Sequence, residues 1–129
     1  MSGTIRILSS DHDTLIWDVA GWVFDLAVDY MIVELEAGNS RLASFLSAGR
    51  AASQGFDYVD LEELSSDDYG TVVEAAQRAR PRIVEWIGKA ENPADAEIRL
   101  AREAQLARFD ELLNLLKKGF QRRSGKTSG

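Results

Sequence analysis

The sequence has 129 residues, the size of a single domain, and 45% of them are hydrophobic, which is typical of a globular protein. It contains no cysteine, which excludes disulfides, thiolate metal sites and cysteine nucleophiles. The net charge of −6 is unevenly distributed, because residues 1–116 carry 10 basic and 21 acidic side chains, a net charge of −11, and the other five basic residues all follow. An acidic body of this kind repels nucleic acid and anionic membranes and steers association toward a basic partner.

The first apolar segment, residues 9–38, reads SSDHDTLIWDVAGWVFDLAVDYMIVELEAG. Residues 14–33 contain three aspartates, and the free energy needed to transfer them into a bilayer exceeds the free energy gained from about ten apolar side chains. We therefore do not expect a membrane span. We predict instead one buried helix of about 27 residues, with a Ser10–Asp13 capping box and Gly38 just past its end. Five carboxylates would form its single strip facing water: Asp11, Asp18, Asp25, Asp29 and Glu36.

Three further helices follow in the predicted order. Asn39 or Ser40 caps the second, which ends near Gly55, and Ser65 or Ser66 begins the third, which Pro81 should kink or split. Asn92 and Pro93 begin the fourth, which runs to about residue 118. An apolar seam on this last helix should pack along the first helix, which has a similar predicted length: Leu106, Phe109, Leu113, Leu116 and Phe120.

These elements predict an all-α fold, a small four-helix bundle with two long and two shorter helices. We expect a single helical domain over residues 1–120 and a flexible basic tail over residues 121–129. The sequence leaves open whether residues 56–59 and 4–8 pair as a minor two-stranded β ribbon.

The sequence contains no catalytic motif that we can identify. His12 is the only histidine, so a two-histidine metal site is excluded, and a triad would depend on this one residue. Asp25 and Asp29, one helical turn apart, could bind Mg²⁺ if a second acidic cluster faced them, but a solvated helix face explains them more simply. We therefore predict no enzymatic activity, no metal and no cofactor.

The candidate contact surface is centred on Trp22, which lies on the acidic side of the predicted first helix. A tryptophan between carboxylates is suited to anchor a basic protein partner, and the alternative is that the bundle closes over it. We call the predicted partner-binding residues the Trp22 surface: Trp22, Asp18, Asp25, Asp29 and Glu36. A secondary candidate is the acidic cluster Glu62, Glu63, Asp67 and Asp68.

Charge and the lack of catalytic residues favour a small acidic protein-binding module. The leading hypothesis is a bacterial immunity or antitoxin-type protein that neutralises a basic effector, such as a nuclease toxin. The alternatives are a secretion or assembly chaperone, an Mg²⁺-dependent all-α phosphohydrolase using the acidic clusters, and a structural homo-oligomer. We expect a protein partner rather than nucleic acid or a membrane, a monomer or homodimer, and a cytoplasmic location because no secretory signal is evident.

Overall fold

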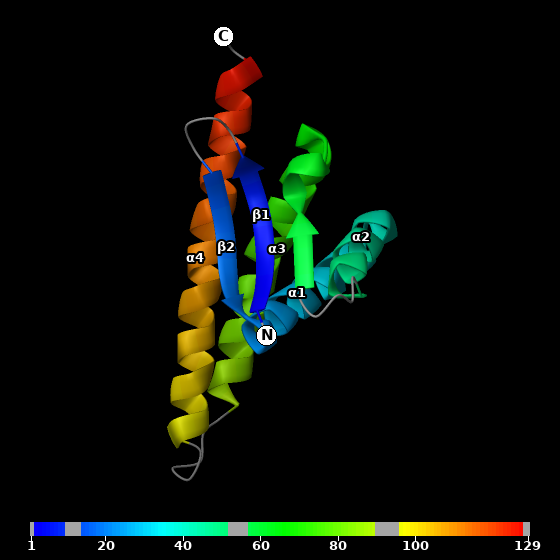
Figure 1. The fold of residues 1–129 in the computed structure, drawn as a ribbon. Coiled ribbons are helices and arrows are strands. Elements are labelled where there is room, and N and C mark those ends of the chain that lie inside the picture. The colour runs from blue at the N-terminus through cyan, green and yellow to red at the C-terminus, as the bar shows by residue number, and fades with distance from the viewer. Residues whose placement is uncertain (1, 10–13, 52–56, 90–95, 128–129) are drawn as a thin grey trace.

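The computed structural model describes residues 2–9, 14–51, 57–89 and 96–127. Two strands, β1 (Ser2–Ser9) and β2 (Thr14–Ala20), precede helices α1 (Gly21–Glu36) and α2 (Ser40–Ala51). A short strand β3 (Asp57–Asp60) leads through a 3₁₀ turn, η1 (Leu61–Glu63), into helix α3 (Ser66–Gly88), and helix α4 (Ala96–Thr127) follows. Figure 1 shows the three strands side by side in front of α3 and α4.

The sheet has the order β2-β1-β3 and is mixed. β1 pairs with β2 in antiparallel fashion, with Ile5 opposite Trp17, and with β3 in parallel fashion, with Ile5 opposite Val59. The all-α four-helix bundle that we predicted is therefore wrong: four helices accompany a three-stranded sheet. The pairing that the sequence left open, between residues 4–8 and the segment before Leu61, does occur through β1 and β3, although Phe56 lies outside the described residues.

The segment from Thr14 to Ala20 is a strand where we predicted the first half of a long helix. Burial alternates along this segment, because Leu15 and Trp17 are buried and Ile16 and Asp18 are exposed. A two-residue period of burial is typical of a half-buried strand. Helix α1 begins only at Gly21 and has 16 residues. The predicted capping box and Asp11 of the acidic strip lie outside the described residues.

Helix α1 packs against α2, α3 and β1. Phe24, Met31 and Leu35 are buried on it. Phe24 lies so close to β1 that a Cβ atom at Gly3 would overlap its side chain, so a glycine is required there. The Oδ1 atom of Asn39 then accepts a hydrogen bond from the backbone N–H of Leu42 at 3.1 Å and caps α2.

Helix α3 begins as the sequence predicted and runs without interruption to Gly88. The Ser65 hydroxyl accepts a hydrogen bond from the backbone N–H of Asp68 at 3.1 Å, which is an N-cap. Pro81 lies inside α3 on its exposed side and does not split the helix. Because Pro81 has no N–H, the backbone oxygen of Gln77 lacks its helical partner, and both residues lie on the exposed side of α3.

Helix α4 packs mainly along α3 and on β2, and it makes little contact with α1. The predicted pairing of the first and last helices is therefore wrong, because residues 14–20 form a strand and leave α1 too short to match α4. Phe109 and Leu116 are buried as expected, but Phe120 is 45% exposed. Helix α4 also extends through Thr127, past its predicted end near Lys118 and into the segment predicted as a flexible tail.

One hydrophobic core lies between the sheet and the helices, with residues from every strand and helix. Trp17 is buried in it, whereas Trp86 is only partly buried at its edge. Among the described residues, every helix is too short or too polar to cross a membrane.

Candidate functional site: the groove beside Trp22

Trp22 is the most exposed aromatic side chain that the structure describes. It lies in the first turn of α1, directly after the end of β2, and 62% of its surface is accessible. Its neighbours Val23 and Phe24 are buried, so the exposure belongs to this side chain and not to the whole turn. The alternative that the fold closes over Trp22 is therefore excluded for the described part of the chain.

The carboxylates of the Trp22 surface come from two elements rather than one helix. Asp18 lies on β2, where it is exposed and its Oδ1 atom accepts a hydrogen bond from the Thr4 hydroxyl at 3.0 Å. Asp25, Asp29 and Glu36 lie on α1, Asp25 partly buried and the other two exposed. The continuous helical strip is thus wrong, but Asp18 and Trp22 still meet where the strand turns into the helix.

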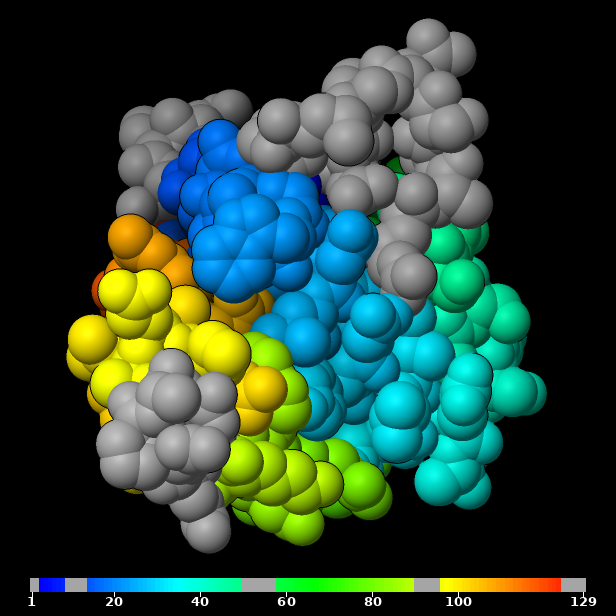
Figure 2. Space-filling model, turned by 90° about the horizontal axis from the view of Figure 1, so that it is seen from below, coloured from blue at the N-terminus to red at the C-terminus, as the bar shows by residue number. Residues whose placement is uncertain are grey.

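A groove opens beside Trp22, between the end of β2, the start of α1 and the middle of α4. Its volume is about 520 Å³, and its lining includes Asp18, Val19, Ala20, Trp22, Gln105 and Arg108. Figure 2 shows the blue surface of β2 and the start of α1 directly beside the yellow and orange surface of α4. The groove therefore joins parts of the chain that are more than 80 residues apart, as the bond between Gln105 and Val23 also shows.

Two hydrogen bonds fix α4 against the other two walls of the groove. The indole Nε1–H of Trp17 on β2 donates to the backbone oxygen of Arg108 at 3.1 Å. The side-chain Nε2–H of Gln105 donates to the backbone oxygen of Val23 on α1 at 3.0 Å. Because both bonds link side chains to backbone atoms, they set the distance between the helix and the opposite walls.

Gln105 is only 1% exposed, and its Oε1 atom has no hydrogen-bond partner among the described residues. Val23 accepts through a carbonyl oxygen, so it requires the amide nitrogen of Gln105 and leaves Oε1 on the other side. Buried polar atoms are nearly always paired, and an unpaired one indicates an unmet contact. Because Gln105 is among the residues that line the groove, this unpaired acceptor belongs to its wall but is covered in the free protein.

Arg108, the one cation among the described residues that line the groove, is held by a neighbour on its own helix. Its Nη1 atom lies 3.0 Å from Oε1 and 3.2 Å from Oε2 of Glu111. Glu111 thus balances the charge of Arg108, whereas Asp18 on the opposite wall has no ion pair with any described residue.

Sequence reasoning missed Gln105 and Arg108. The signal available for Gln105 was its place in a row of α4 residues at spacings of four and three: Gln105, Phe109, Leu112, Leu116 and Gly119, all of them buried. A polar side chain in an otherwise apolar buried row needs a specific partner. Arg108 had no such signal, because its position depends on the docking of α4 beside β2.

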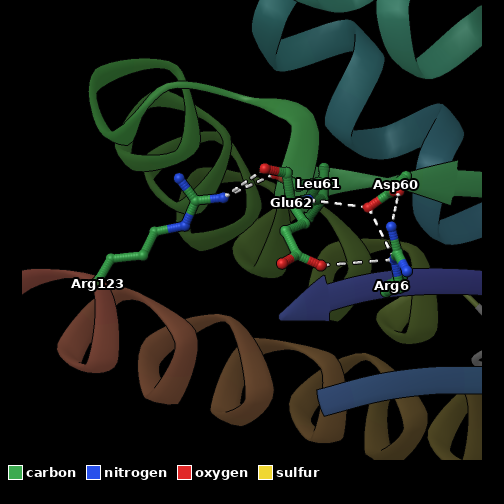
Figure 3. Close-up of polar contacts among 5 residues, drawn as sticks. All are labelled: Arg6, Asp60, Leu61, Glu62 and Arg123. Carbon is green, nitrogen blue, oxygen red and sulfur yellow. Dashed lines mark hydrogen bonds and ion pairs between the residues drawn. The ribbon is translucent and has the colours of Figure 1, made fainter. Parts of the chain in front are cut away.

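The secondary acidic cluster is used in part to hold the fold together (Figure 3). Glu62 lies 3.7 Å from Arg6, whose guanidinium pairs with both carboxylate oxygens of Asp60. The Arg41 guanidinium, 2.7 Å from Asp68, holds the pKa of that carboxyl below its usual value. Glu63 and Asp67 are exposed.

The structure does not assemble the acidic residues into a metal centre. In the ranges it describes, no three acidic or histidine side chains converge closely enough to hold an ion. Asp25 and Asp29 lie on α1, whereas the secondary cluster lies around η1 and the start of α3. The facing arrangement that the Mg²⁺ hypothesis required is thus not observed among these residues.

The arrangement of side chains around Trp22 is the candidate functional site. It combines an exposed indole, a carboxylate on the neighbouring strand and an unpaired amide oxygen on α4. The chain matches no model of a known protein family, and neither a curated protein nor a solved structure shows significant similarity to it.

Proposed function

We propose that this chain is a small protein-binding module whose contact surface is centred on Trp22. The observation that carries the proposal is the exposure of this indole, 62%, at the edge of a groove of about 520 Å³. An exposed indole lacks the stabilisation that most aromatic side chains obtain from burial on folding. Tryptophan is also enriched among the residues that contribute most of the binding energy at interfaces. A partner that covers Trp22 would recover that burial.

Charge indicates which partners suit the surface. Residues 1–116 carry a net charge of −11, and the Trp22 surface contains four carboxylates, with Arg108 as a basic neighbour in the groove. A basic protein is therefore attracted, and a nuclease is basic where it holds phosphate. We propose that the chain acts in the bacterial cytoplasm as an immunity or antitoxin-type protein that covers such a basic effector.

The test is capture of a defined partner, the product of the adjacent gene, by purified wild-type and variant proteins. Trp22→Ala should weaken binding by roughly 30- to 1,000-fold, the range for loss of a dominant interface residue. Phe120→Ala is the matched control, because Phe120 is also an exposed aromatic but lies near the far end of α4, in a different groove. Equal capture by the wild type and Trp22→Ala would reject the proposal.

A further inference from the structure

The groove beside Trp22 offers acceptors and an aromatic face to whatever enters it. Asp18 contributes a carboxylate, Gln105 contributes an amide oxygen without a partner, and Trp22 contributes an indole. The Nη1 atom of Arg108 is bound to Glu111. A ligand that complements Asp18, Gln105 and Trp22 carries positive charge and donates several hydrogen bonds.

A guanidinium group meets these requirements better than an ammonium group. It is planar, has five N–H donors in a fixed arrangement, and stacks on aromatic rings, whereas an ammonium is a strongly hydrated point charge. Within the described parts of the chain, an arginine lies over an aromatic ring at two places. The Arg102 guanidinium lies 4.5 Å from the ring centre of Trp86, and that of Arg123 lies 4.4 Å from the ring centre of Tyr69.

We propose that the groove binds an arginine side chain of the protein partner, an inference that rests on the proposed function. The guanidinium stacks on the indole of Trp22, pairs with the Asp18 carboxylate and donates to Oε1 of Gln105. The volume of about 520 Å³ also leaves room for the backbone on either side of that arginine. Since Gln105 is almost completely covered in the free protein, its side chain has to shift when the donor arrives.

The direct test uses wild-type protein and three small probes in an NMR titration: acetyl-arginine amide, acetyl-lysine amide and acetyl-citrulline amide. The arginine probe should shift the indole N–H signal of Trp22 and the side-chain amide signals of Gln105. We expect it to bind at least about 5-fold more tightly than the lysine probe, because only a guanidinium is planar and forked. The citrulline probe has nearly the same shape without the charge and should leave both signals unchanged.

Two variants locate the interaction. Asp18→Asn should weaken binding of the arginine probe by roughly 5-fold or more, because it removes the charge that faces the guanidinium. Glu74→Gln, which removes one exposed charge on α3 beside a different groove, should leave binding unchanged. Equal affinity for the arginine and lysine probes, shifts confined to other signals, or no effect of Asp18→Asn would overturn the arginine assignment.

The two proposals fail in different ways. If Trp22→Ala abolishes capture of the partner while the arginine probe leaves the Trp22 and Gln105 signals unmoved, the surface binds protein but the groove does not take arginine. If the arginine probe binds as expected while Trp22→Ala captures the partner normally, the groove is specific for guanidinium but the proposed function is wrong.

Discussion

Trp22 and Phe24 are separated by one residue and have opposite environments, because Trp22 is exposed and Phe24 is completely buried beside Gly3. Phe24→Ala should lower the free energy of unfolding by about 3–5 kcal/mol through loss of burial and creation of a cavity. Trp22→Ala should change it by less than about 0.5 kcal/mol. Urea denaturation of both variants measures the difference, and similar losses at the two positions would mean that Trp22 is a structural residue.

Tyr69 gives the fold a defined response to alkaline pH. Its hydroxyl donates to the backbone oxygen of Leu116 at 2.7 Å, and burial raises the pKa of Tyr69 to about 12. Because this value is above the ordinary tyrosine pKa of about 10, the folded state retains the proton longer than the unfolded state. The resulting stability is fully present below about pH 10 and is lost as the pH rises toward 12.

Tyr69→Phe should therefore remove part of the alkaline loss of stability, in addition to costing about 1 kcal/mol at neutral pH for the missing hydrogen bond. The measurement is the free energy of unfolding between pH 8 and about 11.5 for both proteins. Tyr58→Phe is the control, because Tyr58 is a partly exposed tyrosine of the sheet. If Tyr69→Phe and the wild type lost stability in parallel above pH 10, ionisation of Tyr69 would not be coupled to unfolding.

At the scale of single elements, β2 explains why the predicted fold class was wrong. Asp18 and Asp25 are seven residues apart. This spacing is compatible with two turns of one helix, but it is equally compatible with a strand that is followed by a helix. The alternation of Leu15 and Trp17 with Ile16 and Asp18 favoured a strand, as did the β-branched and aromatic content, but Ile16 is apolar and masked the period. A local pattern could not decide this, because β2 is stabilised by pairing with β1 and by packing under α4.

Elements whose signals are local were predicted well. The caps at Asn39 and Ser65 and the buried face of α1 depend on residues within a few positions of each other. At the candidate site, the exposure of Trp22 agrees with its place among aspartates, whereas its role as an anchor stays a prediction. The groove was not predictable, because its third wall is α4. The position of α4 depends on the sheet, which the sequence did not predict.

The end of α4 yields a prediction at this scale, because Arg123 binds the turn before α3 (Figure 3). Its guanidinium donates to the backbone oxygens of Leu64 at 2.8 Å and Leu61 at 2.9 Å. Arg123→Met should lower the free energy of unfolding by about 1.5–3 kcal/mol, as for hydrogen bonds from a charged donor. Lys118→Met, an exposed basic residue on the same helix, should have almost no effect in the same denaturation experiment. Equal stability of the wild type and Arg123→Met would show that this part of α4 acts as the flexible tail that the sequence suggested.

For the whole molecule, the position of the charges matters more than their sum. Asp18→Asn with Asp25→Asn should slow association with a basic partner about 3- to 10-fold at low salt and flatten its salt dependence, since charges near a contact surface steer encounter. Glu63→Gln with Asp67→Asn changes the net charge equally, but in the secondary cluster, and should have the smaller effect. Stopped-flow association rates at two salt concentrations measure both, and equal slowing by the two pairs would assign the effect to net charge alone.

The central strand of the sheet is also the first to be synthesised. β1 finds β2 within a few residues, but its other neighbour, β3, begins 48 residues after β1 ends. At ordinary translation rates of about 5–20 residues per second, β3 emerges roughly 2–10 s after β1. During that interval one edge of the β1–β2 hairpin has unpaired backbone groups, which readily pair with strands of other chains. The free edge of β1 therefore stays available for mispairing until β3 is made, and β3 precedes both α3 and α4 in the chain.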